Sequence, residues 1–210
     1  LLEGDVSPAC RVADDYEDLI DLAPGVPDHM CALGRDLLPR RYGSYEALDL
    51  PARRTALRQA DLWGAGGYAW VFLGALEQDL GAFRRLDAEF FCEGLHDILD
   101  RHPNQHLINR LAAFTALSLS GPAPDDSVQG RVRDAFGWIV QDHLRELHPV
   151  IWATAPMPGR GARVELEDED LSARGVARAL SAIAEHFGPQ LADGEKVVIG
   201  PEGFAFKPGH

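Results

Sequence analysis

Glu93 and His96 stand three residues apart, a spacing at which a helix places a carboxylate and an imidazole on the same side. Helical bundles that bind two metal ions use this pair, together with carboxylates and histidines from other helices. Glu89 lies one helical turn before the pair, and Asp142 and His143 offer a second carboxylate and imidazole from a later segment. One interpretation is therefore a metal-dependent, di-iron-like helical enzyme with iron, manganese or zinc as its ion.

The helical phase of the same segment argues for a different interpretation. At 100° per residue, Phe91, Leu95 and Ile98 fall on one arc, and Glu93 and His96 fall on the opposite arc. Ligands of a buried ion must point into the bundle, whereas these two side chains are expected to face water. The chain also has no second Glu-x-x-His pair. We therefore favour a solvated acidic face over a metal site.

Aromatic side chains form the second candidate site. Trp63, Tyr68 and Trp70 flank a glycine-rich turn, and later segments contribute Trp138 and Trp152. Aromatic rings beside a glycine turn would suit a flat or apolar ligand. The same five rings would also suit an ordinary helical core, and the sequence leaves both interpretations open.

The composition excludes several classes of function. Thirty-three acidic and 20 basic residues give a net charge of −13, which argues against nucleic acid as the main partner. The longest charge-free apolar run, Leu62–Leu76, is shorter than the roughly 20 residues that a bilayer span requires. Three cysteines without a Cys-x-x-Cys pair predict a reducing, cytoplasmic setting. Almost all basic residues are arginine, which is typical of a GC-rich genome.

The periodicity predicts a mainly α fold, a single globular domain of about six helices with a small β element. A short helix is expected near the N-terminus, and short strands are expected around 149–166, where β-branched and alternating residues gather. A hairpin is expected at 196–207, on either side of a Gly-Pro-Glu-Gly turn. The main helices are expected at 51–62, 68–80, 82–101, 105–118, 128–147 and 171–187.

Three parts of the chain differ in composition and in hydrophobic pattern. Residues 1–50 are expected to form an irregular N-terminal wrap with one short helix, and 51–148 the helical core. Residues 149–210 are expected to form an α+β part that packs on the same core. The uniformly apolar segment Tyr68–Leu80 needs cover on every side, either within this core or in a homodimer.

No common hydrolase, nucleotide or calcium motif is present in the sequence. We therefore expect a soluble acidic helical binding or regulatory module without a cofactor. Its expected partner is a protein or an apolar small molecule. The metal-dependent enzyme built on Glu93 and His96 is the alternative.

Overall fold

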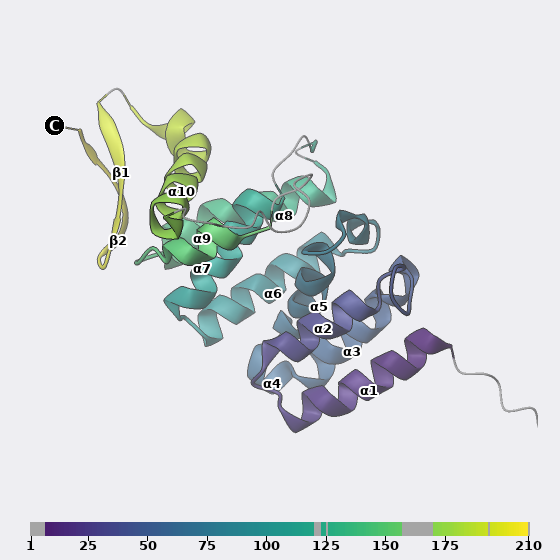
Figure 1. The fold of residues 1–210 in the computed structure, drawn as a ribbon. Helices are drawn as coiled ribbons and strands as arrows, with labels where there is room; N and C mark the ends of the chain where they lie inside the picture. Colours follow the sequence, from purple (N-terminus) through teal and green to yellow (C-terminus); the bar gives the residue numbers. More distant parts are fainter. Residues whose placement is uncertain (1–6, 120–122, 125, 157–169, 193, 210) are drawn as a thin grey trace, which may run out of the picture. The chain divides into compact units, whose positions relative to one another are not determined.

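The computed structural model describes residues 7–119, 123–124, 126–156, 170–192 and 194–209 (Figure 1). These residues form ten α-helices and one two-stranded antiparallel sheet, which confirms the mainly α fold with a small β element. No helix among them is long and apolar enough to cross a membrane. The chain divides into two compact units, residues 1–102 and 103–210. The boundary falls inside the segment 51–148 that was expected to form one core.

Unit 1 is built from helices and short 3-10 turns. Its elements are α1 (Pro8–Leu22), α2 (Pro27–Asp36), η1 (Tyr45–Ala47), α3 (Asp49–Arg58), α4 (Ala60–Trp63), α5 (Gly66–Leu76), η2 (Leu80–Arg84) and α6 (Ala88–Arg101). The sequence predicted one short helix before residue 51, and the structure has a second, α2. Pro27 begins that helix at a position where the missing N–H costs nothing, so this proline starts a helix instead of interrupting one.

Helix α5 is the core of unit 1, and each of its residues is buried. Helices α2, α3 and α6 pack around it (Figure 1). Glycines permit the closest approaches, because a side chain at Gly74 would collide with the backbone of Cys31 and one at Gly67 with that of Ala56. Gly67, at the end of the glycine-rich turn, and Gly74, within α5, thus serve close helix packing.

Unit 2 combines helices with the hairpin. Its elements are α7 (Gln105–Ala113), the π-helical turn η3 (Phe114–Ser118), α8 (Val128–Trp138), the π-helical turn η4 (Ile139–His143), α9 (Pro149–Thr154), α10 (Leu171–Phe187), η5 (Gly188–Gln190), β1 (Glu195–Gly200) and β2 (Gly203–Pro208). The side chain of Asp170 caps α10 by accepting hydrogen bonds from two backbone N–H groups.

The hairpin confirms the prediction at 196–207. Its register pairs Val197 with Phe206 and Ile199 with Phe204. The rings of Phe204 and Phe206 face Phe187 at the end of α10, with centroids 4.7 and 6.5 Å away. A strand pair alone is marginally stable in water, and this aromatic contact attaches it to α10.

The strand expected from residue 149 onward is wrong, since Pro149–Thr154 is the helix α9. Pro149 occupies the first turn of α9, and Trp152 is completely buried. Placing Val150 and Ile151 in a helix costs only a few tenths of a kcal/mol each relative to alanine. The free energy gained by burying the side chain of Trp152 is larger than this cost. The rest of the expected strand pair, from 157 to 166, lies outside the described residues.

Candidate binding groove

Helix α6 buries the side that its sequence period predicts. Phe91, Leu95 and Ile98 are fully buried, and Glu93 and His96 are exposed. Glu89 also lies on the exposed side. The carboxylates of Glu89 and Glu93 and the imidazole of His96 therefore face solvent, where a buried ion could not use them.

The predicted metal ligands form no metal site within the ranges that the structure covers. No group of three His, Cys, Asp or Glu side chains there is arranged to hold an ion. Asp142 and His143 lie in η4 of unit 2, whereas Glu93 and His96 belong to unit 1. The ring of His143 packs edge-on against Trp138 at 6.0 Å.

The predicted aromatic ligand residues of unit 1 are core residues. Trp63, Tyr68 and Trp70 are each at most 4% exposed. The indole N–H of Trp63 donates to the carbonyl of Pro24 at 2.7 Å, and its ring packs edge-on against Trp70. The Tyr68 hydroxyl accepts from the backbone N–H of Asp87 at 2.9 Å. Burial raises the pKa of Tyr68, so this hydroxyl stays protonated.

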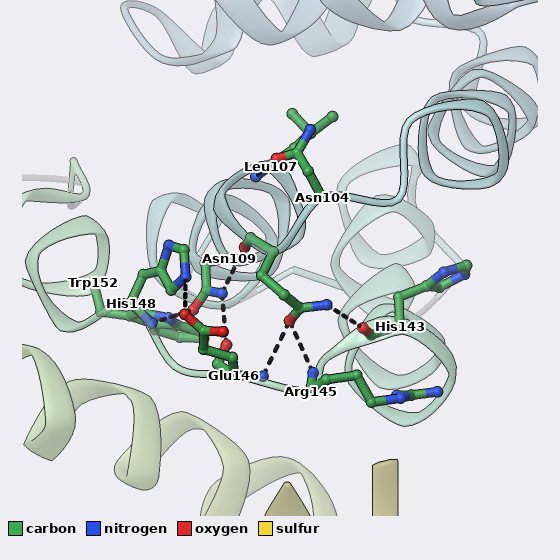
Figure 2. Close-up of polar contacts among 9 residues, drawn as sticks. Asn104, Leu107, Asn109, His143, Arg145, Glu146, His148 and Trp152 are labelled. Carbon is green, nitrogen blue, oxygen red and sulfur yellow. Dashed lines mark hydrogen bonds and ion pairs between the residues drawn. The ribbon is translucent and has the colours of Figure 1, made fainter. Parts of the chain in front are cut away.

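In unit 2, Trp152 is a core residue held by the amide of Asn109 (Figure 2). Asn109 is 0% exposed. Asn109 Oδ1 accepts from Trp152 Nε1 and from the backbone N–H of His148, both at 2.9 Å. Its Nδ2 donates to the carbonyls of Gln105 and Glu146 at 2.7 and 2.8 Å. All four hydrogen-bonding positions of this amide are used, which is typical of a structural residue.

A second amide, Gln105, holds the other half of the same loop. Its Oε1 accepts from the backbone N–H groups of Arg145 and Glu146 at 2.9 and 3.1 Å, and its Nε2 donates to the carbonyl of His143 at 3.1 Å. Gln105 and Asn109 stand one turn apart on α7, so together they fix the segment 143–148. The network therefore holds a loop in place, and its central amide, Asn109, has no free hydrogen-bonding position for a ligand.

Helix α3 carries the feature that sequence analysis did not predict. Its buried side is made of small side chains, including Ala52, Thr55 and Ala56. Its outer side carries two large leucines, Leu50 and Leu57, which are 65% and 79% exposed. The small side chains are required because α3 packs against Gly67 of α5 almost backbone to backbone, and this leaves the leucines outside.

Leu57 borders a depression of about 290 Å³, the α3–α6 groove. Its wall on one side belongs to α3 and α4, its wall on the other side to α6, and its floor is the turn before α5. The lining residues are Arg53, Ala56, Leu57, Ala60, Gly64, Ala65, Phe90 and Glu93. Most of these side chains are apolar, so the groove suits an apolar group.

Two residues of α6, Asp97 and Arg101, hold the floor of the groove in place. Gly64 adopts φ +57°, a backbone conformation that favours glycine, and the next N–H, that of Ala65, donates to Asp97 Oδ2 at 2.7 Å. Arg101 donates to the carbonyls of Ala60 and Asp61 at 3.2 and 3.1 Å. These contacts hold the floor at the end of the groove near Arg101.

Arg53 closes the opposite end. Its guanidinium binds Asp49 and Asp87, both at 3.0 Å, and lies 5.3 Å from the centre of the Phe90 ring. The ion pair with Arg53 lowers the pKa of Asp87. Beyond Arg53 lies a second depression of about 420 Å³, lined on α3 by Asp49, Leu50 and Arg53. Because two carboxylates compensate Arg53, it contributes little net positive charge to the groove.

Of the residues expected to bind a ligand or metal, only Glu93 lines the groove. The groove residues on α3 were not predicted. The sequence of Asp49–Arg58 contains small residues, leucines and arginines, but it does not reveal which side of this helix is buried. Comparisons of the chain with protein-family models, with curated proteins and with solved structures find no match. Its function must therefore be inferred from the geometry of this groove.

Proposed function

We propose that this chain is a binding module that engages a protein partner through the α3–α6 groove. The observation that carries the proposal is Leu57, a large apolar side chain left 79% exposed beside an apolar depression. Single exposed leucines are common on protein surfaces. Here Leu57 is not isolated, because Ala56, Ala60 and Phe90 line the same groove and the charged Arg53 and Glu93 lie at its edge.

The size of the groove favours a protein side chain over a small molecule. Ligand pockets that enclose a drug-sized molecule have volumes of roughly 300–1,000 Å³ and bury most of the ligand. The α3–α6 groove, at about 290 Å³, lies at the lower limit. It suits one or two apolar side chains from an amphipathic helix, which is a common mode of peptide recognition.

The other interpretations have less support. The aromatic residues expected to line a small-molecule pocket are packed in the core, apart from the half-buried Trp138. No observation favours the metal-dependent enzyme. The cytoplasmic location and the homodimer stay predictions.

A binding assay tests the proposal. The probe is a fluorescent 14-residue helical peptide with leucines along one face and glutamines elsewhere. We expect saturable binding to the full chain, and we expect Leu57→Glu to weaken it at least tenfold, since the substitution places a charge in the apolar contact.

Leu22→Glu is the matched control, because Leu22 is 84% exposed and lines neither depression. It should bind the peptide as the unmodified chain does. Absence of saturable binding, or equal affinities for the Leu57→Glu and Leu22→Glu variants, would contradict the proposal. Circular dichroism of each variant reports whether the fold is retained.

A further inference from the structure

We infer that the partner of the α3–α6 groove is a basic amphipathic helix. This inference rests on the proposed function and specifies the chemistry of the partner. It follows from a line of exposed acids on α6, Glu89, Glu93 and Asp100, which we call the acidic row. Spacings of four and seven residues place these acids on one side of the helix, and Glu93 lines the groove itself.

The charges around the groove are unbalanced. Arg53 is compensated by Asp49 and Asp87. Among the described residues, no cation forms an ion pair with Glu93 or Asp100. A partner that covers Glu93 without supplying a cation would bury an uncompensated carboxylate, which is costly. A partner with lysine or arginine at this edge would satisfy it and would associate faster.

The layout of the groove suits a helix that lies along α6. Arg53 pairs with Asp87 at one end, and Arg101 binds the carbonyls of Ala60 and Asp61 at the other, so α3 and α4 run alongside α6. The acidic row spans residues 89–100, about 16 Å at 1.5 Å per residue. A docked helix would place its leucines against Leu57 and Phe90 and its cations against the acidic row.

The same charges argue against two other occupants. A second copy of this chain would bring another −13 net charge and its own acidic row to the contact, and like charges that face each other oppose association. The phosphates of an anionic membrane would be repelled for the same reason. A basic helix is therefore the occupant that the charges favour.

Three peptides that share one leucine face test the inference. Their remaining positions carry lysine, glutamine or glutamate. In 50 mM NaCl we expect the lysine peptide to bind the full chain at least tenfold more tightly than the glutamine peptide, and the glutamate peptide to bind most weakly. In 500 mM NaCl the difference between the peptides should shrink, because salt screens exposed charges.

Glu93→Lys should reduce the preference for the lysine peptide more than Glu93→Gln does, because it places a cation within the acidic row. Asp15→Lys is the matched control, because it changes the net charge as much as Glu93→Lys does, at an exposed position of α1 outside the groove. This variant should keep the preference.

Each outcome decides between the two proposals. If the glutamine and lysine peptides bind equally and Leu57→Glu weakens both, the binding module stands and the basic partner is wrong. If Asp15→Lys loses the preference as fully as Glu93→Lys does, the acidic row is not the source, and the inference is also wrong. If no peptide binds, both proposals fail.

Discussion

Asn109 illustrates how one buried side chain can organise a loop. It stands on α7, and its amide holds the backbone at Glu146 and His148 as well as the indole of Trp152. In the sequence it is one of four polar or charged residues of the helix, with Gln105, His106 and Arg110. Its role depends on a loop some 37 residues away, so the sequence does not reveal it.

Asn109→Ala should lower the free energy of unfolding of unit 2 by about 2–4 kcal/mol, because it leaves buried donors and acceptors without partners. Asn104→Ala, which removes only the N-cap of α7, should cost about 1 kcal/mol. Urea unfolding followed by the amide hydrogen exchange of α7 and α9 measures both. Equal losses for the two variants would show that the amide network is not important for stability.

His186 should make the stability depend on pH. It packs against the ring of Phe136 at 5.2 Å and covers Gly137. Burial lowers the pKa of His186 below its ordinary value of 6.5, an effect that Arg133 increases and Asp134 opposes. As the pH falls below about 6.5, the unfolded chain therefore takes up a proton before the folded chain does, and the free energy of unfolding decreases.

His186→Gln should reduce this decrease between pH 7.5 and 5.5, as measured by the urea midpoint. His96→Gln, on the exposed side of α6, is the control and should leave it unchanged. If the His186→Gln variant loses as much stability at low pH as the unmodified chain does, the pH dependence has another source.

At the scale of the element, glycines decide how closely the helices approach. Gly74 of α5 faces the backbone of Cys31 on α2, and Gly67 faces that of Ala56 on α3. This close contact leaves α3 no room for large side chains on its inner side. The exposure of Leu50 and Leu57, and hence the groove, follows from the glycines of a neighbouring helix.

Gly74→Ala should lower the free energy of unfolding of unit 1 by about 1–3 kcal/mol, because the added methyl group forces α2 and α5 apart. At Gly25 an added methyl group would have no neighbour within 4 Å, so Gly25→Ala should change the stability by less than about 0.5 kcal/mol. Thermal unfolding followed by circular dichroism compares the two. A neutral Gly74→Ala variant would refute close packing at this crossing.

The helices that the sequence predicts best have clear amphipathic periods. Helix α10 has the expected bounds, 171–187. Helix α6 ends at Arg101 as expected but begins at Ala88 and not at residue 82, because the side chain of Asp87 caps it. The failures concern segments in which a local signal competes with packing. Pro27 resembles an interruption, and Val150 and Ile151 resemble a strand, yet both segments are helical because buried residues such as Met30 and Trp152 stabilise them there. Tertiary burial outweighs propensities of a few tenths of a kcal/mol.

For the whole molecule, unit 1 contains the elements that bury its central helix, α5, and that form the groove. Helices α2, α3 and α6 all precede residue 103. We therefore expect residues 1–102, expressed alone, to be helical by circular dichroism and to unfold cooperatively in urea. A fragment without a cooperative transition would contradict the assignment of α5 as a core covered within unit 1.

The candidate site could be predicted only in part. The exposed phase of Glu93 follows from the period of one helix, but the groove needs α3, α4 and α6 to meet at the turn of Gly64 and Ala65. Local patterns in the sequence do not reveal this tertiary arrangement. The acidic residues were therefore predictable, and the apolar surface beside them was not.

The most direct test of the binding groove is an amide NMR titration of the full chain with the lysine peptide. We predict that the largest chemical-shift changes fall on residues 53–65 and 89–97, which line or border the α3–α6 groove. Changes concentrated elsewhere, or no change at saturating peptide, would contradict the account.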